Sequence, residues 1–159
     1  MSLQIERTWG VISDTHGLLR SEAFEHLKEV ERILHAGDVG NPEVIERLVE
    51  LAPVQAVRGN VDRGGWANVL PMTEAIEFGP HLLYLIHILD DIDLIPEAAG
   101  ISTVIYGHTH VPKIEEKQGV TYFNPGSLGP RRFSLPVSMG RLHLLSDGSL
   151  LPELIELEI

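Results

Sequence analysis

Residues 8–17, TWGVISDTHG, join a short β-forming run directly to a polar cluster. Residues 8–12 have the composition of a strand, and Ser13-Asp14-Thr15-His16-Gly17 follows them. Asp14 and His16 are two positions apart, so an extended backbone would direct both side chains to the same side. Taken alone, this motif is a weak signal because Asp14 can equally serve as a turn or helix-cap residue. Its weight depends on whether the other strands end in the same way.

The first half of the chain alternates between strand and helix patterns. Residues 33–36 and 54–57 are further short β-type runs. Residues 21–32 have apolar side chains at helical spacing, with Ser21 as the expected N-cap. Asn41 and Pro42 open a second helix that extends to residue 51. This βαβαβ order predicts a parallel sheet with right-handed crossovers.

The second half is richer in strands. Residues 73–78 alternate between apolar and polar side chains, as a half-buried strand does. Residues 82–88 and 103–106 are apolar runs typical of buried strands, and residues 90–99 between them are predicted to form a short helix. From residue 111 onward short strands alternate with turns at Gln118-Gly119, Pro125-Gly126 and Asp147-Gly148. We therefore expect two sheets packed together and covered by helices, in one domain that spans residues 1–159.

Composition narrows the class of function. The chain has 159 residues, of which 43% are hydrophobic and 22% charged, as is typical of globular proteins. Its net charge of −11 argues against a protein that mainly holds duplex nucleic acid. The absence of cysteine excludes disulfides, zinc fingers and thiol nucleophiles. No apolar run is long enough to cross a bilayer and the N-terminus lacks a signal-peptide pattern, so a cytoplasmic location without membrane partners is expected.

Metal-binding residue types recur where the predicted strands end. The oxygen donors are Asp14, Asp38 and Asn60, and the nitrogen donors are His16, His87, His108 and His110. The carboxyl ends of parallel strands meet at one sheet edge, so these side chains are expected to converge. Mixed nitrogen and oxygen donors without sulfur favour Mn²⁺, Fe, Ni²⁺ or Zn²⁺. Seven ligands exceed one tetrahedral site and suit two ions that share a bridging carboxylate and a bridging water.

Each element of this set also has an ordinary structural interpretation. His87, within an apolar run, resembles a hydrogen-bonded core histidine. Gly37-Asp38 and Gly59-Asn60 can each be plain turns. The structural account, however, requires a separate coincidence at each strand end, and the shared metal site requires none. Three histidines away from these strand ends, His26, His81 and His143, are expected to be solvated or structural.

The ordered series Asp14-x-His16, Gly37-Asp38, Gly59-Asn60, His87 and Gly107-His108-x-His110 resembles the calcineurin-like metallophosphoesterase superfamily. Asn124-Pro125-Gly126-Ser127, with Pro130-Arg131, looks like its branch of small single-domain phosphodiesterases. The resemblance covers essentially the whole chain. It implies an α/β fold, a four-layer α/β/β/α sandwich of two mixed β-sheets flanked by helices, with a dinuclear metal centre.

The resemblance also implies roles for individual residues. Asp14, His16 and His110 would hold the first ion, Asp38 would bridge both, and Asn60, His87 and His108 would hold the second. The implied reaction is hydrolysis of a small phosphodiester by a hydroxide that bridges two divalent ions, with Mn²⁺ expected and Fe, Ni²⁺ or Zn²⁺ as alternatives. Asn60 and Arg131 are expected to contact the substrate phosphate.

Two positions depart from the pattern of the superfamily. Val61 stands where many members have a histidine that protonates the leaving group, and Asp62 follows it. Asp62 is therefore a candidate general acid, with a structural role as its alternative. Ile88 follows His87 where the branch commonly has glycine, and it is expected to narrow the pocket or shift the loop.

Two other functions remain open at the level of sequence. A retromer scaffold subunit has the fold implied here and acts as a non-catalytic platform for protein interaction. A nuclease acting on long nucleic acid fits the chemistry but not the net charge of −11. The expected partner is a small phosphoester, and edge strands in the second half can support a homo-oligomer.

Overall fold

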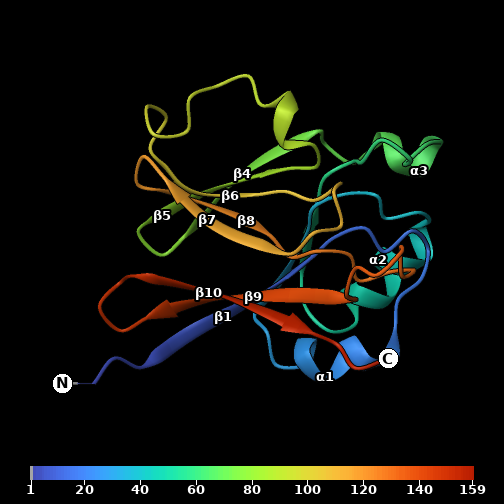
Figure 1. Cartoon of the computed structure of the whole chain (residues 1–159), viewed down its shortest axis with the longest axis horizontal. Helices are drawn as coiled ribbons and strands as arrows, with labels where there is room; N and C mark the ends of the chain where they lie inside the picture. Colours follow the sequence, from blue (N-terminus) through green and yellow to red (C-terminus); the bar gives the residue numbers. More distant parts are fainter. Residues whose placement is uncertain (1) are drawn as a thin grey trace.

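The computed structural model describes residues 2–159, which form two five-stranded sheets packed face to face (Figure 1). The first sheet, in spatial order, consists of β10 (Leu150–Glu156), β9 (Ser138–Leu145), β1 (Ile5–Ile12), β2 (Arg32–His35) and β3 (Val54–Ala56). The second consists of β4 (Thr73–Phe78), β5 (His81–Ile86), β6 (Ile101–Ile105), β8 (Val120–Asn124) and β7 (Lys113–Lys117). Both sheets are mixed, as expected from the resemblance.

Among the named strands, parallel pairing occurs only between those that carry the polar clusters. β1 pairs with β2 and β2 with β3 in parallel, which confirms the sheet predicted from the βαβαβ order. In the second sheet β5 pairs with β6 and β6 with β8, also in parallel. The other strand pairs are antiparallel. The polar residues that follow these parallel strands consequently lie at shared sheet edges.

The predicted helix over residues 21–32 is much shorter than expected. A 3₁₀ turn, η1 (Ser21–Ala23), precedes the single helical turn α1 (Phe24–Leu27). Ser21 is not the N-cap, because Arg20 occupies that position and makes no side-chain cap bond. The chain must already enter the sheet near Glu31, whose N–H donates to the Thr8 carbonyl. The helical spacing of Ala23, Leu27 and Val30 therefore reports a shared buried face rather than a long helix.

The second predicted helix is observed as α2 (Pro42–Val49). Asn41 caps it, since its side-chain oxygen accepts from the backbone N–H of Val44. Val44 and Leu48 are buried against the first sheet. The predicted start is correct, and the helix ends two residues before the predicted position.

The prediction of a helix over residues 90–99 is wrong. A 3₁₀ turn, η2 (Leu89–Asp91), forms at its start and a hydrogen-bonded turn over residues 95–99 at its end, but the backbone at Ile92 between them is extended. Leu89, Ile92 and Leu94 nevertheless pack on the outer face of the second sheet. A short helix that was not predicted, α3 (Gly65–Asn68), lies between β3 and β4. The second outer layer is thus mostly irregular chain rather than helix.

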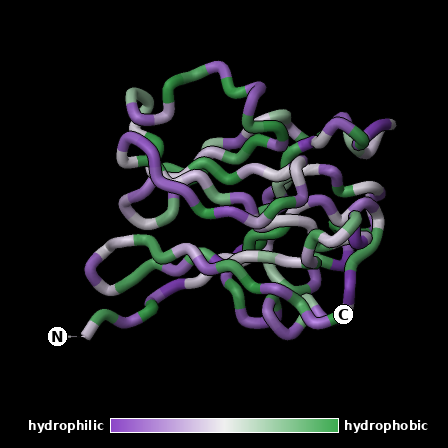
Figure 2. Tube along the Cα trace, in the orientation of Figure 1, coloured by the Kyte–Doolittle hydropathy of each residue, from purple (hydrophilic) through white to green (hydrophobic). Residues whose placement is uncertain are grey.

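Apolar side chains form three clusters that define the layers. The cluster between the sheets includes Trp9, Leu34, Leu83 and Phe123. In it the Trp9 ring stacks on the Phe78 ring, with 3.9 Å between the ring centroids. The other two clusters lie outside the sheets, under α1 and α2 on one side and under residues 88–94 on the other. Figure 2 shows apolar residues along the paired strands and hydrophilic residues in many of the connections. No helix within residues 2–159 is both long and apolar enough to cross a membrane.

Candidate metal centre

The structure brings together all seven side chains that the sequence nominated as metal ligands. They follow the ends of five strands: Asp14 and His16 after β1, Asp38 after β2, Asn60 after β3, His87 after β5, and His108 and His110 after β6. Although 96 positions separate them in the sequence, Asp14 Oδ1 and His110 Nε2 lie 3.2 Å apart. Side chains from both sheets therefore meet at one place.

The backbone adopts left-handed conformations at five of these residues. The φ angles are positive at Asp14 (56°), His16 (48°), Asp38 (57°), His108 (74°) and His110 (65°). Non-glycine residues rarely occupy this region, and such strain persists only where surrounding structure enforces it. Hydrogen bonds between neighbouring loops supply that constraint, for example from Asp14 N to the Gly37 carbonyl at 3.0 Å and from His16 N to the Asp38 carbonyl at 2.9 Å.

Asp14, His16 and His110 form a first group of ligand atoms that all lie within 4.8 Å of one another. Among residues 2–159, Asp14 Oδ1, His16 Nε2 and His110 Nδ1 are buried and have no hydrogen-bond partner. Buried polar atoms without partners are costly, and Asp14 Oδ1 lies 3.6 Å from His16 Nε2 and 3.2 Å from His110 Nε2, so the arrangement of these three atoms fits a cation bound between them. The other Asp14 oxygen, Oδ2, accepts from Ser13 Oγ at 2.6 Å, which fixes the carboxylate and leaves Oδ1 available.

Asp38, His87 and His108 form the second group, within the same 4.8 Å limit. His87 Nδ1 lies 2.7 Å from the Ala36 carbonyl, an acceptor to which it must donate. In the neutral imidazole this leaves a lone pair on Nε2, which lies 3.1 Å from Asp38 Oδ2 and 3.0 Å from Asn60 Oδ1. Three acceptors that converge in this way require a cation or a proton between them.

Asn60 links the second group to the surface. Its Oδ1 lies 3.2 Å from His108 Nδ1 as well as next to His87. Both Asn60 and His108 are exposed, whereas His87 and Asp38 are buried. A small molecule from solvent can thus reach this side of the cluster, while the carboxylate stays inside.

The two groups adjoin one another. His16 Nε2 lies 3.6 Å from Asp14 Oδ1 and 3.6 Å from Asp38 Oδ2. His87 Nε2 is 4.0 Å from Asp14 Oδ1. The carboxylate of Asp38 is therefore within reach of ligands from both groups, as a bridging ligand must be.

Charge within the cluster favours ionised carboxylates. Burial by itself would raise the pKa of both Asp14 and Asp38, but neighbouring histidines outweigh it and hold both values below the usual range. Contact with Asp14 raises the pKa of His16 despite partial burial. Burial lowers the pKa of His87, yet Asp38 and Asp14 more than offset it and the pKa is raised. Metal ions and protons thus compete for the same imidazoles.

Comparison with known proteins assigns the chain to a family. The model of the calcineurin-like phosphoesterase superfamily domain matches residues 8–147. The chain belongs to this superfamily. The family resemblance drawn from the sequence motifs is thereby confirmed, and the domain model covers every residue of the two ligand groups.

Individual relatives agree with this assignment. A probable metallophosphoesterase of Methanothermobacter thermautotrophicus is 34% identical over 142 residues, which cover 82% of each chain. The phosphodiesterase YfcE of Escherichia coli K12 is 35% identical over 107 residues, or 63% of this chain and 58% of that protein. Vacuolar Protein Sorting 29 from Cryptosporidium parvum shares the fold, with a TM-score of 0.76 and 20% identity over 98% of this chain and all of that one.

Asp62 is buried and its carboxylate is fully engaged by the backbone. It accepts from the N–H groups of Val39 at 3.1 Å, Gly40 at 2.9 Å and Gly59 at 2.9 Å. These bonds tie the loop of Asp38 to the loop of Asn60. Of the two roles considered for Asp62, the contacts favour the structural one over proton transfer to a leaving group.

Arg131 lies on the exposed loop that follows Ser127. The positive charge of the adjacent Arg132 lowers the pKa of His16, although carboxylates dominate there, so this loop runs near the first ligand group. Ser127 Oγ donates to the Asp14 carbonyl at 3.0 Å, which attaches the base of the loop to the centre. A contact between Arg131 and substrate remains a prediction.

His35 is the supporting residue to which the sequence analysis gave no role. It is fully buried; its Nδ1 accepts from Gly37 N at 3.1 Å, and its Nε2 therefore donates to Thr15 Oγ1 at 3.0 Å. Thr15 in turn donates to the Val39 carbonyl. The ring thus connects the loop of Asp14 to the loop of Asp38. The position of His35 at the end of β2, beside Gly37-Asp38, is the sequence feature that could have indicated this supporting role.

The histidines expected to be structural are bonded within the fold or remote from the centre. His81 contacts Ser102 Oγ and the Gly148 carbonyl. His143 lies between Thr8 Oγ1 at 2.8 Å and Glu153 Oε1 at 2.9 Å. His26 lies on α1, on the outer side of the first sheet. None of these three belongs to either ligand group within residues 2–159.

Proposed function

We propose that this chain is a phosphodiesterase that hydrolyses a small phosphodiester with two divalent metal ions, Mn²⁺ in the first instance. The observation that carries the proposal is the convergence of lone pairs at the two ligand groups, above all between His87 Nε2, Asp38 Oδ2 and Asn60 Oδ1. Membership of the calcineurin-like phosphoesterase superfamily supports the reaction class.

Each ligand has a defined part in this proposal. Asp14, His16 and His110 would hold one ion, Asn60, His87 and His108 would hold the other, and Asp38 would be shared between them. Two such ions would supply activation of a water molecule near neutral pH and positive charge beside the reacting phosphate.

The protein's own groups orient the reaction. The Ala36 carbonyl fixes the His87 ring in the tautomer that presents Nε2, and Ser13 fixes Asp14. Asn60 lies at the exposed side of the centre, where a phosphate oxygen can approach. Arg131, on the exposed loop after Ser127, is proposed to contact the phosphodiester anion through its guanidinium.

The site lacks an evident general acid to protonate the leaving group. Val61 occupies the position of the usual histidine, and Asp62 is committed to three backbone donors. Esters whose alcohol leaves readily as an anion, such as nitrophenyl esters, should therefore react fastest.

The test is metal-dependent turnover of bis-(p-nitrophenyl) phosphate. We expect EDTA to abolish hydrolysis and Mn²⁺ to restore it, with elemental analysis giving two ions per chain in the active protein. Undiminished hydrolysis by protein shown to be free of metal would refute the proposal. Restoration at one ion per chain would refute the dinuclear part alone.

A non-catalytic scaffold is the second candidate, favoured by the fold shared with Vacuolar Protein Sorting 29 over 98% of this chain. A scaffold has no chemical need for seven converging ligands. Failure to hydrolyse any phosphoester after metal loading, together with a stoichiometric protein partner, would favour this function over catalysis.

A further inference from the structure

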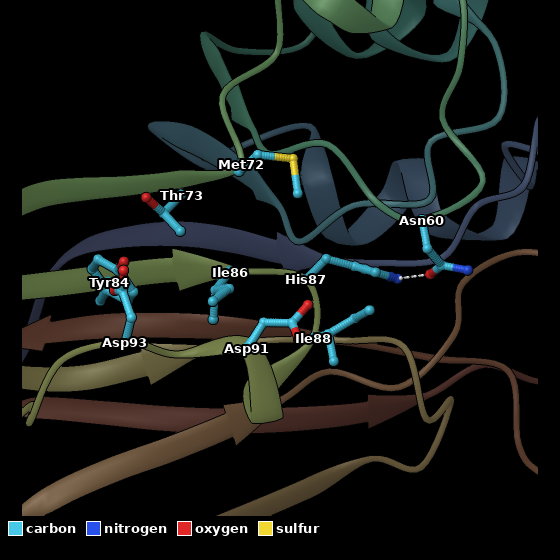
Figure 3. A pocket seen from close by; sticks show the side chains of 9 residues that line it. All are labelled: Asn60, Met72, Thr73, Tyr84, Ile86, His87, Ile88, Asp91 and Asp93. Atoms are coloured by element: carbon cyan, nitrogen blue, oxygen red, sulfur yellow. Dashed lines mark hydrogen bonds between the residues drawn. The ribbon is translucent and has the colours of Figure 1, made fainter.

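A cavity of about 400 Å³ adjoins the candidate metal centre on the side of the second ligand group (Figure 3). His87, a member of that group, and Asn60, whose Oδ1 lies 3.0 Å from His87 Nε2, both line the cavity. The volume falls in the range of small-molecule sites. A phosphodiester bound at the metal centre would thus have one of its two ester substituents beside this cavity.

The wall of the cavity combines apolar and polar side chains. Met72, Tyr84, Ile86 and Ile88 contribute to it, and the segment after β5 forms one side. In Figure 3, His87 and Asn60 lie toward one end of the cavity, and Tyr84 and Asp93 lie toward the other. An ester substituent can therefore extend from the metal centre along Ile86 and Ile88 toward Tyr84.

The charged residues of the cavity wall are carboxylates. Asp91 and Asp93 both line it and are exposed at its rim. No lysine or arginine is among the described residues that line it. Arg58 lies nearby but outside the wall, where it donates to Met72 Sδ at 3.2 Å and Asn68 Oδ1 at 3.1 Å. An aromatic ring with two carboxylates is a combination that attracts an ammonium group.

We propose that this cavity is the subsite for a cationic ester substituent, so that the substrate is a phosphodiester with a quaternary or primary ammonium group on one of its alcohols. The inference rests on the proposed phosphodiesterase function and names its substrate class. A substituent with a second phosphate or a carboxylate would meet Asp91 and Asp93 and be disfavoured. A neutral substituent would fit the apolar side chains of the wall but gain nothing from the two carboxylates.

Three p-nitrophenyl phosphodiesters separate these contributions. They carry choline, its uncharged carbon isostere 3,3-dimethylbutanol, or methanol as the second alcohol. In each, water adds to phosphorus, the bond to p-nitrophenolate breaks, and the other alcohol stays on the phosphate product. Because the leaving group is constant, differences in kcat/KM report the subsite. We expect the choline ester to exceed its isostere about 5- to 10-fold, as two partly exposed carboxylates allow.

Removal of the two charges should remove this discrimination. In D91N/D93N the ratio of kcat/KM for the choline ester to that for its isostere should fall to near one. The matched control is E46Q/E50Q, which removes two exposed charges at α2, on the opposite outer side of the sandwich. This control should retain the wild-type ratio, since only the net charge of the protein has changed.

The outcomes distinguish the subsite from the reaction. Hydrolysis of the methyl ester without preference for choline, or a preference that D91N/D93N retains, would overturn the subsite and leave the proposed function intact. Failure to hydrolyse even the methyl ester after Mn²⁺ loading would overturn the proposed function. Calorimetric affinities for phosphocholine and 3,3-dimethylbutyl phosphate then test the cavity directly, and equal affinities would overturn the subsite.

Discussion

Gly59 lies directly against Asp38, and the space between them leaves no room for a side chain. A β-carbon at residue 59 would overlap both Asp38 Oδ1 and the backbone nitrogen of Asp38, and it would lie 2.8 Å from Asp38 Cγ. The backbone at Gly59 is not left-handed, so the requirement for glycine here is purely one of space. The loop after β3 can approach the loop after β2 only because this position has no side chain.

Gly59→Ala should therefore displace the carboxylate of Asp38. We expect Mn²⁺ affinity to fall at least about tenfold and stability to fall by about 1–3 kcal/mol, the usual cost of overpacking. The measurements are calorimetric metal binding and thermal unfolding. Gly65→Ala is the matched control, since nothing lies within 4 Å of a β-carbon there, and it should change stability by less than about 0.5 kcal/mol. Equal metal affinity in the two variants would contradict this account.

Asp38→Ala should lose metal and activity together, because the carboxylate is within reach of both ligand groups. Elemental analysis after dialysis should show fewer than one ion per chain, and hydrolysis of bis-(p-nitrophenyl) phosphate should fall by several orders of magnitude. Glu46→Gln, an exposed acid on α2, serves as the control and should retain both properties. Two tightly bound ions in Asp38→Ala would rule out a bridging role.

Asp62→Asn separates a structural role from proton transfer. Replacement of one oxygen by an amide sets a donor against the N–H groups of Val39 and Gly59, or against that of Gly40. We expect a loss of about 1–3 kcal/mol in stability and weaker metal binding. The shape of the pH profile of kcat/KM should be preserved in the metal-saturated variant. A variant of wild-type stability that lost the basic limb of that profile would instead identify Asp62 as the general acid.

His35 should make the metal-free protein sensitive to mild acid. Burial lowers its pKa to about 4 from an ordinary 6.5, so between these values the unfolded chain binds a proton that the folded chain does not. Stability from this group is complete above pH 6.5 and is lost as pH falls toward 4, by about 3 kcal/mol in total. Protonation would also remove the acceptor for Gly37 N.

Chemical unfolding in EDTA at pH 7, 5.5 and 4 measures this effect, with His35→Asn as the reference. Asn offers an acceptor in place of Nδ1 and does not titrate, and it leaves His16 and His87 in both proteins. The difference in unfolding free energy between wild type and variant should shrink as pH falls. A difference independent of pH would show that His35 does not titrate over this range.

The sequence by itself determined which residues end the strands and in what order. Parallel strands place their carboxyl ends at one edge, so Asp14, Asp38 and Asn60 could be brought together without knowledge of any distance. The same strand-end rule covered His87, His108 and His110, and the superfamily motifs then divided the ligands between two ions. The whole ligand set could therefore be named before the fold was seen.

Tertiary structure alone decided how long the helices are and what surrounds the ligands. The spacing of apolar side chains over residues 21–32 correctly indicated that they share a buried face. The chain enters β2 directly afterwards, which limits α1 to one turn. Likewise, only folding joined Asp62 to three backbone donors and set Asp91 and Asp93 at the rim of a cavity beside His87. Spacing along a chain encodes which side of an element is buried, whereas the partner of each polar group depends on loops that meet only when the two sheets pack.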